Sequence, residues 1–388
     1  MSLRASEDVE ILRRSLARFV AEEVRPLEKE HRLPGDVSPP AELRRRVRMR
    51  SHELGLYAAD MPHEVGGAGL SLSERVVLDA EAFSHETVFF EDLMGGPGGP
   101  SSILLACNDR QRERYLAPLV RGEITTCFAL SEPEAGSDAT GLRLRAEKRG
   151  ARYVLNGSKN IITNAVQCDF AMVFAVTDEA RGAMGGITCF LVEKGTPGFS
   201  VGRSHTCMGF SGFQGELVFE DCEIPADAIL GQEGFGLALA LDWINANRIK
   251  IGAMAAGVTR RLLAASATHA RARRQFGRAI GENQGVQWKL ADMATDLFAT
   301  ESMVTCAARM WDEKLDVRKE AAMVKLYASE MVNRAAYEAI QIHGGAGCLV
   351  ETGLERVYRM VRVYTIVEGT SEIQRMGIAR KVLKEHAA

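Results

Sequence analysis

The sequence predicts a mainly helical protein with a central β domain: an N-terminal helical bundle, an antiparallel β-sandwich or barrel, and a C-terminal helical bundle. Three observations support this fold class. Apolar residues recur at helical spacing near the N-terminus, short β-branched and aromatic segments alternate with turn residues in the middle, and helix formers dominate again towards the C-terminus. The domains expected from these changes of pattern span residues 1–122, 123–234 and 235–388.

The N-terminal region carries apolar residues about one helical turn apart, which predicts an amphipathic helix. They are Val9, Leu12, Leu16, Phe19 and Val20. Glycine and proline clusters at 33–35, 65–69 and 95–100 interrupt the helical pattern.

The middle region, from about Ile124 to Leu230, contains short segments that are typical of strands. They are Arg152–Leu155, Phe170–Thr177, Gly186–Glu193 and Glu216–Phe219. Their spacing indicates antiparallel pairing and not βαβ units. The glycine clusters of the chain do not follow a strand and open a helix, so we do not interpret them as dinucleotide-binding motifs.

The C-terminal region reads as long helices from about Gly236. Met323, Leu326, Tyr327 and Met331 form a stripe at helical spacing, and we interpret the stripe as core. Gly344 and Gly345 are placed where a helix C-cap would end this helix.

Composition and charge exclude several classes of protein. The chain has 388 residues and a net charge of −3, which argues against a broad nucleic-acid-binding surface. Eight cysteines are scattered singly without a CxxC pair, so neither a metal site nor a dithiol redox site is predicted. Acidic residues near the N-terminus and the lack of a long apolar stretch predict a cytoplasmic protein without a membrane span. One arginine run is interpreted as a solvated helix face: Arg44, Arg45, Arg46, Arg48 and Arg50.

The segment from Phe128 to Asp138, FALSEPEAGSD, combines turn residues with hydroxyl groups. Turns rich in small residues present backbone N–H groups and hydroxyls together, which suits an anion or a flat heteroaromatic ring. On these grounds alone an ordinary capped turn remains the alternative. The segment resembles the first signature of the acyl-CoA dehydrogenase family.

Four further motifs, in the same order along the chain, resemble that family. They are the flavin-side strand 159–164 (KNIITN), 273–277 (RRQFG) with Asn283 and Gln284, 341–345 (QIHGG) with 355–359 (ERVYR), and 367–375 (VEGTSEIQR). The resemblance implies an FAD enzyme of fatty acid metabolism that removes two hydrogens from an acyl-CoA and passes electrons to an electron-transfer flavoprotein. It also implies a homo-oligomer, usually a tetramer.

The resemblance assigns a role to each matching position. Four residues would line the flavin, two would flank its ring, seven would hold the adenine half of FAD across a subunit boundary, and two more would contact the cofactor after the base. The residues that would line the flavin are Phe128, Leu130, Ser131 and Ser137, and those that would flank its ring are Ile162 and Thr163. The residues that would hold the adenine half are Arg273, Gln275, Phe276, Gln284, Gln341, Gly344 and Gly345. The two contacts after the base would be Thr370 and Glu372. The expected contacts with the acyl-CoA are Ser137, Asn245, Arg248 and Gly369.

The resemblance makes Glu368 the expected catalytic base, whereas on the residues alone a glutamate before Gly-Thr would more often be a capping or solvent-exposed residue. Abstraction of a weakly acidic thioester α-proton needs a carboxylate in a site that excludes water. The apolar flank Ile366–Val367 is expected to desolvate Glu368 and to raise its pKa. In the family, the β-hydrogen leaves as hydride to flavin N5. Some relatives carry the base immediately before the CoA-binding arginine, where this chain has Asn247.

The chain departs from the family pattern at five positions: Asn245, Ile161, Val367, Ala346 and Met360. Small residues at two of them, Val367 and Ala346, are expected to reshape the acyl cavity. Two other interpretations stay open. One is a relative with different flavin chemistry, an acyl-CoA oxidase or a flavin monooxygenase, and the other is a non-catalytic flavin- or CoA-binding protein.

Overall fold

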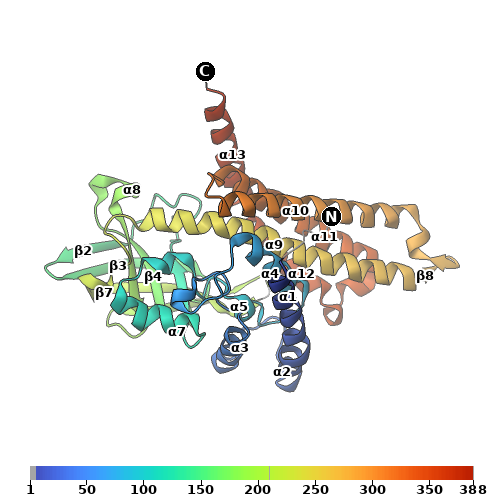
Figure 1. The fold of residues 1–388 in the computed structure, drawn as a ribbon, viewed down its shortest axis with the longest axis horizontal. Coiled ribbons are helices and arrows are strands. Elements are labelled where there is room, and N and C mark those ends of the chain that lie inside the picture. Colours follow the sequence, from blue (N-terminus) through green and yellow to red (C-terminus); the bar gives the residue numbers. More distant parts are fainter. Residues whose placement is uncertain (1–5, 209, 388) are drawn as a thin grey trace. The chain divides into compact units, whose positions relative to one another are not determined.

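A computed structural model describes residues 6–208 and 210–387. The chain divides into two compact units that are each formed from separate parts of the sequence (Figure 1). One unit, here called the helical unit, comprises 1–27, 71–87 and 245–388. The other, here called the sheet unit, comprises 28–70 and 88–244.

The helical unit is built from long helices, as the periodicity predicts. Its labelled helices are α1 (Glu7–Phe19), α4 (Leu72–Ser84), α10 (Gln284–Asp312), α11 (Arg318–His343), α12 (Leu354–Arg362) and α13 (Ser371–Glu385), together with most of α9 (Gly236–Ala272). A two-stranded hairpin of β8 (Arg274–Gln275) and β9 (Arg278–Ala279) joins α9 to α10. None of the helices in the described residues combines the length and hydropathy that crossing a bilayer requires.

Close packing in this unit depends on glycine at one helix crossing. A Cβ atom on Gly257 in α9 would stand 2.2 Å from the carbonyl oxygen of Ala80 in α4. The core around this crossing is made of Leu72, Val76 and Ala80 from α4 with residues of α9, α10 and α11. The predicted C-cap of α11 is confirmed, because Gly344 follows His343 with φ 61° and its N–H reaches carbonyls of the last turn.

The sheet unit contains a seven-stranded sheet, which agrees with the predicted β domain. The strands are β1 (Thr126–Ala129), β2 (Arg145–Arg149), β3 (Arg152–Ile162), β4 (Phe170–Val176), β5 (Ile187–Glu193), β6 (Phe199–Cys207) and β7 (Phe210–Pro225). Most neighbours pair antiparallel, in the order β1-β4-β2-β3-β7-β6 with β5 beside β4. The pairing of β1 with β4 is parallel, and so is the single contact of β2 with β4. The short helices of this unit are α3 (Ala41–Glu53), α5 (Phe90–Met94), α6 (Asp109–Gln111), α7 (Ala117–Val120) and α8 (Ala183–Gly186), and α2 (Arg25–Glu30) crosses into it.

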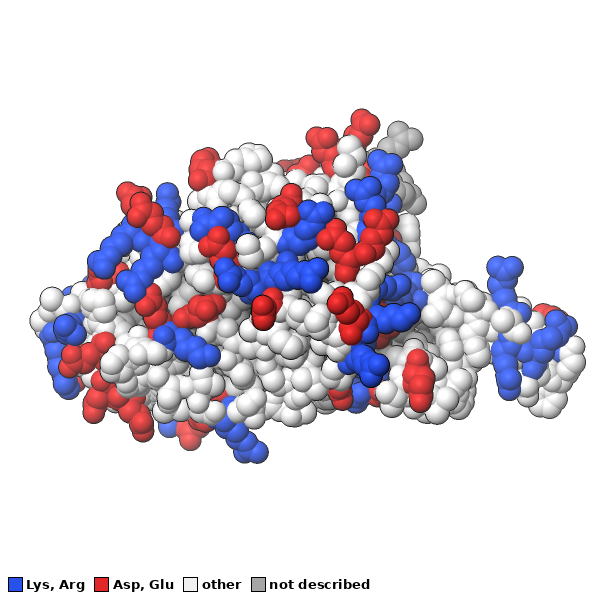
Figure 2. All heavy atoms as spheres, turned by 90° about the horizontal axis from the view of Figure 1, so that it is seen from below, with Lys and Arg blue, Asp and Glu red and all other residues white. Residues whose placement is uncertain are grey.

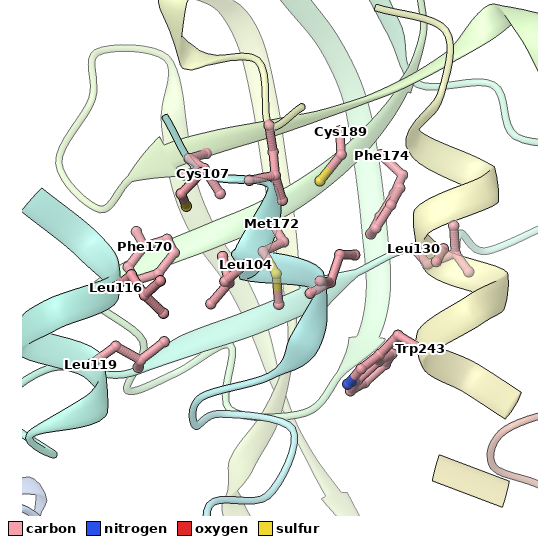
Figure 3. Packing of buried hydrophobic residues seen from close by; sticks show 14 of the residues in the cluster. Leu104, Cys107, Leu116, Leu119, Leu130, Phe170, Met172, Phe174, Cys189 and Trp243 are labelled. Carbon is pink, nitrogen blue, oxygen red and sulfur yellow. The ribbon is translucent and has the colours of Figure 1, made fainter. Parts of the chain in front are cut away.

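One face of the sheet packs against helices through a large apolar cluster (Figure 3). Phe170, Met172 and Phe174 alternate along β4 and point into this cluster, as side chains on one face of a strand must. Trp243 of α9 belongs to the same cluster. The opposite face of β4 contributes Ala171 and Val173 to a second core, so both faces of β4 are buried.

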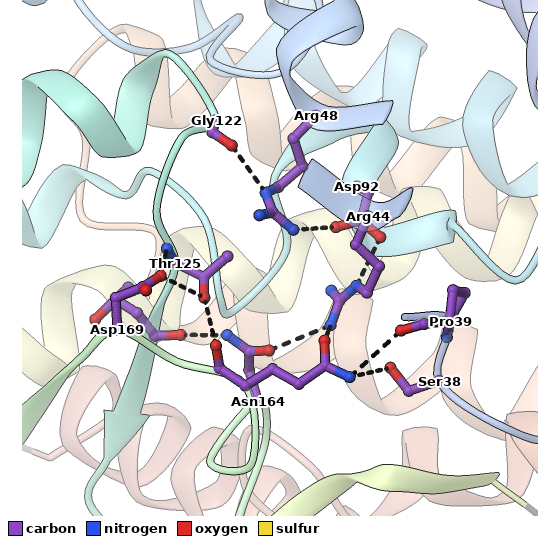
Figure 4. Close-up of polar contacts among 11 residues, drawn as sticks. Ser38, Pro39, Arg44, Arg48, Asp92, Gly122, Thr125, Asn164 and Asp169 are labelled. Atoms are coloured by element: carbon purple, nitrogen blue, oxygen red, sulfur yellow. Dashed lines mark hydrogen bonds and ion pairs between the residues drawn. The ribbon is translucent and has the colours of Figure 1, made fainter. Parts of the chain in front are cut away.

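The prediction that the arginine run is a solvated helix face is wrong for two of its members. Arg44 and Arg48 of α3 are buried and share the carboxylate of Asp92 in α5, at 2.8 Å from Arg44 Nε and 3.1 Å from Arg48 Nη1 (Figure 4). Arg44 also donates to the side chain of Asn164, whose own amide donates to Thr126 O. Arg44 therefore anchors α3 to the loop after β3, and the buried carboxylate of Asp92 makes the burial of both arginines possible.

Candidate active site

Glu368 lies in the short segment before α13, with its backbone in the left-handed region at φ 54°. Loss of hydration raises the pKa of its carboxyl group to about 7, while Arg248, a hydrogen bond from Asn247, and Lys325 act in the opposite direction. The direction agrees with the sequence-based expectation. The flanking Ile366 and Val367 are 53% and 43% exposed, and a contribution of this apolar flank to the desolvation stays a prediction.

Three side chains hold the backbone at Glu368. Arg248 Nε donates to the carbonyl oxygen of Glu368 at 3.2 Å. Gln374 Nε2 donates to the same oxygen at 3.0 Å and to the carbonyl oxygen of Gly369 at 2.8 Å. Lys325 Nζ donates to the latter at 2.7 Å. Since a left-handed conformation is unfavourable for a residue with a Cβ atom, these bonds compensate for the strain at Glu368.

Arg248 is held in turn by Asn245, one helical turn earlier in α9. Its Nη1 donates to Asn245 Oδ1 at 2.9 Å. Burial lowers the pKa of Arg248, although the charge of Glu368 opposes this effect. Two of the four residues expected to contact the acyl-CoA, Asn245 and Arg248, are thus joined to each other and to the segment that carries Glu368.

The residues after Glu368 form the turn into α13. Gly369 has φ 91°, which favours glycine. Thr370 is the N-cap of α13, and its side chain accepts a hydrogen bond from Ile373 N at 3.4 Å. Glu372 in the first turn is exposed, where a carboxylate complements the positive end of the helix.

In the sheet unit, Lys159 joins the two segments that are expected to face the flavin. It is fully buried, and its Nζ donates to Leu130 O at 3.0 Å and to Glu132 Oε1 at 2.7 Å. Burial lowers the pKa of Lys159 to about 8, and the charge of Glu132 opposes this change. Asn160 N adds a bond to Ser131 O at 3.0 Å. These contacts fix the end of β1 beside the end of β3.

The expected flavin-facing residues differ in exposure. Phe128 is half-buried and packs on the Trp243 ring with centroids 4.4 Å apart. Ile162 is only 2% exposed and belongs to a core, whereas its neighbour Ile161 is 62% exposed. Leu130 is buried, Ser131 and Thr163 are partly exposed, and Ser137 is exposed. Ile161 therefore offers exposed apolar surface at this edge, next to the predicted flavin contacts Ile162 and Thr163.

The expected adenine-binding residues of the helical unit lie on open surface. Arg273, Gln275, Phe276, Gln284, Gln341, Gly344 and Gly345 are all exposed. Phe276 is 100% exposed at the tip of the β8–β9 hairpin. On the face drawn in Figure 2 acidic and basic side chains alternate, except at the right-hand end, where basic side chains gather around this hairpin. A Cβ atom on Gly344 or Gly345 would meet nothing within 4 Å.

These features fit FAD. Basic side chains beside an exposed aromatic ring suit a diphosphate next to an adenine ring. Backbone N–H groups and hydroxyls near exposed Ile161 suit the polar edge and the apolar face of a flavin. Fold and site together define a flavoenzyme with a desolvated carboxylate.

Comparison with known proteins agrees with this definition. Family models match in three successive stretches: the acyl-CoA dehydrogenase N-terminal domain at 6–123, the middle domain at 127–222 and the C-terminal domain at 233–383. The chain belongs to the acyl-CoA dehydrogenase family, and it is an FAD-dependent enzyme that oxidises or reduces CoA thioesters.

Individual relatives match over nearly their full length. The mitochondrial short-chain specific acyl-CoA dehydrogenase of Mus musculus is 36% identical, over 99% of this chain and 92% of the relative. The caffeyl-CoA reductase–Etf complex subunit CarC of Acetobacterium woodii is 35% identical, over 96% and 97%. The structure of butyryl-CoA dehydrogenase from Megasphaera elsdenii superposes with a TM-score of 0.87 at 31% identity, over 99% of this chain and 100% of the other. The structure of a glutaryl-CoA dehydrogenase from Mycobacterium smegmatis in complex with FADH2 superposes with a TM-score of 0.87 at 26% identity, over 99% of this chain and 96% of the other.

The motifs in the sequence identified Glu368, Arg248 and Asn245, which the structure brings together. They did not identify Lys325 or Lys159 as part of a site. Lys159 stands in the flavin-side motif, but a lysine there gives no sign of its bond to Glu132. Lys325 lies in α11, outside every motif that the sequence analysis identified.

Proposed function

We propose that the protein removes hydrogens from the α and β carbons of an acyl-CoA thioester, giving the trans-2-enoyl-CoA, and that Glu368 takes the α-proton. The observation that supports this most is the environment of Glu368. Its carboxyl group is desolvated, and its backbone is held by Arg248, Gln374 and Lys325. The alternative base position of the family holds Asn247, which cannot accept a proton at neutral pH.

The pKa of about 7 suits Glu368 to this role. A carboxylate with an ordinary pKa is a weak base, whereas one near the working pH combines a useful ionised fraction with greater basicity. The α-proton moves to a Glu368 oxygen, and the β-hydrogen leaves with its electron pair. FAD, when bound, supplies the acceptor for that hydride. The backbone N–H of Glu368 is proposed to donate to the thioester oxygen, where negative charge develops.

The bound cofactor would be shared between subunits. Phe128, Leu130, Ser131, Ser137 and Thr163 are proposed at the flavin with Ile161 and Ile162, and Thr370 and Glu372 near it. The β8–β9 hairpin and the segment from Gln341 to Gly345 would hold the adenine half in a second copy of the chain. Exposed aromatic residues on the same unit support a homo-oligomer, which we propose to be a tetramer. They include Phe276, Trp288, Phe298 and Tyr337.

The substrate is proposed to contact Ser137, Gly369 and the Asn245–Arg248 pair. Since Arg248 already binds Glu368 O and Asn245, its first effect is to place the base, and any contact with CoA uses its remaining N–H groups.

The electrons are proposed to pass to an electron-transfer flavoprotein, because one relative belongs to a caffeyl-CoA reductase–Etf complex. The same relative supports a second candidate, reduction of an enoyl-CoA. Glu368 serves both directions, since a base that removes the α-proton returns it in the reverse reaction.

An anaerobic titration of the holoenzyme with a panel of saturated acyl-CoAs tests the proposal. Bleaching of the flavin absorbance is expected with at least one of these acyl-CoAs. If no acyl-CoA bleaches the flavin, dehydrogenation is contradicted, and a non-catalytic protein or a reductase is favoured. Rapid reoxidation of the reduced complex in air would indicate an oxidase or monooxygenase. Reoxidation of the dithionite-reduced enzyme by an enoyl-CoA measures the reverse reaction.

A further inference from the structure

Lys325 is a buried cation with no part in the motifs of the chain. It lies in α11 with 0% exposure, and its ammonium group donates to the carbonyl oxygen of Gly369 at 2.7 Å. Lysine is almost never buried completely unless its charge is compensated. A neutral backbone carbonyl gives only part of that compensation.

The charges around Lys325 come from three helices and the segment of Glu368. Glu368, Glu330 of α11 and Glu372 of α13 attract its charge, whereas Arg248 of α9 repels it. Glu330 also accepts a hydrogen bond from Ser371 Oγ at 2.8 Å and lies 3.7 Å from Arg375. Glu372 is exposed to solvent, which screens it.

A neutral donor would suffice to hold the backbone at this place. Gln374 shows this, because its amide already reaches both the Glu368 and the Gly369 carbonyl oxygens. What Lys325 adds is therefore a positive charge one peptide away from Glu368. Such a charge favours the ionised carboxylate that proton abstraction requires.

We infer that Lys325 is a positioning residue of the reaction: it fixes the Glu368–Gly369 turn, and its charge keeps Glu368 ionised when the acyl-CoA is bound. The inference rests on the proposed function, because it gives Lys325 a part in proton abstraction by Glu368. The effect is limited to the pH range in which Lys325 is charged. Burial lowers the pKa of Lys325 to about 8, so the charge is present through neutral pH and is lost above it.

Three substitutions separate hydrogen bonding from charge. Lys325→Met removes both, Lys325→Gln keeps a donor without charge, and Lys325→Arg keeps both. Lys319→Met is the matched control, because Lys319 lies in the same helix and pairs with Glu385 near the C-terminus at 2.8 Å. Each holoenzyme is checked for FAD content, and flavin bleaching in a single anaerobic turnover is measured as a function of pH.

In the wild-type enzyme the bleaching rate is expected to fall as the pH drops below the pKa of Glu368. The Met and Gln variants should show an apparent pKa higher by about 1, and hence roughly tenfold slower bleaching below neutral pH. The difference should fade above about pH 8, where wild-type Lys325 has lost its charge as well. Lys325→Arg and Lys319→Met should keep the wild-type apparent pKa.

If the Met and Gln variants lose rate equally at every pH and keep the wild-type apparent pKa, the inference is overturned, and Lys325 is a structural residue only. If Lys325→Met does not retain FAD, the comparison of Gln with Arg decides the question in the same way. A wild-type enzyme that is bleached by no acyl-CoA would overturn the proposed function itself and this inference with it.

Discussion

Arg248 donates a hydrogen bond to the carbonyl oxygen of Glu368 across 120 residues of sequence, with Nε 3.2 Å from the oxygen. This bond joins the middle of α9 to the segment before α13. Because Nη1 of the same guanidinium binds Asn245, the planar group is fixed at two points. The orientation of the base therefore depends on a side chain whose expected role was binding of CoA.

Lys at position 248 cannot reproduce this geometry, because an ammonium group lacks the planar fork of a guanidinium. Arg248→Lys should retain FAD and slow single-turnover bleaching by about 10- to 100-fold, which corresponds to a charge-assisted bond of ~1.5–3 kcal/mol. Arg260→Lys is the control, since Arg260 lies in α9 and forms a surface ion pair with Glu301. Equal rates for wild type and Arg248→Lys would show that the bond does not orient the base.

Sequence motifs predicted much of this site because its chemical residues stand in short contiguous segments. Glu368, Gly369, Thr370 and Gln374 all fall within one stretch of nine residues. The helical spacing predicted the long helices for a similar reason, since amphipathic periodicity is a local property.

The partners of buried charges could not be predicted in this way. Arg44 and Asp92 are 48 residues apart, and Lys325 and Gly369 are 44 apart. Burial of a charged group depends on tertiary contacts that no local pattern reports. The same reason explains why the arginine run was interpreted as solvated.

The shared carboxylate of Asp92 should be critical for the stability of the sheet unit. Asp92→Asn leaves Arg44 and Arg48 buried without the negative charge that both contact, at a cost of about 3–5 kcal/mol in the free energy of unfolding. Glu123→Gln, which breaks the exposed pair with Arg121, should cost less than about 1 kcal/mol. Urea unfolding followed by far-UV circular dichroism measures both, and equal midpoints would contradict the prediction.

Arg273→Ala should weaken FAD retention and subunit association together, because we propose that the exposed guanidinium binds the diphosphate of FAD held by a second copy. Loss of one charge-assisted contact is worth ~1.5–3 kcal/mol. Flavin content after gel filtration and the mass in solution are measured, with Arg271→Ala as the control for charge. A variant with full flavin and wild-type mass would disprove the shared site.

The raised pKa of Glu368 also predicts how stability changes with pH. Its folded-state pKa of about 7 exceeds the ordinary value of 4.5, so the folded protein binds this proton more tightly than the unfolded chain. The contribution is fully present below about pH 4.5 and is lost as the pH rises through about 7. Glu368→Gln removes this dependence. The Tm of the variant should therefore rise relative to wild type between about pH 5 and pH 8, and a constant difference would show that the pKa of Glu368 is not raised.

The last prediction concerns the chemistry of Glu368. Glu368→Gln keeps the size of the side chain and the hydrogen bonds to its backbone carbonyl, but it removes the base. Positioned general bases contribute about 10²–10⁴-fold in rate. The loss should reach the upper part of that range, because Asn247 offers no second carboxylate.

Flavin bleaching in a single anaerobic turnover measures this loss, since it reports chemistry and not product release. Glu351→Gln is the control, because Glu351 is an exposed glutamate in the short 3-10 helix Val350–Thr352 before α12. Binding is followed separately, through the change in the flavin spectrum on addition of a non-reducible acyl-CoA analogue, and it should survive in both variants. Bleaching of Glu368→Gln within a factor of about ten of wild type would mean that the proton goes to another group. A glutamine that keeps the backbone contacts of Arg248 and Gln374 should leave the site assembled. If Glu368→Gln loses both analogue binding and flavin bleaching, the carboxylate of Glu368 is needed for the structure of the site.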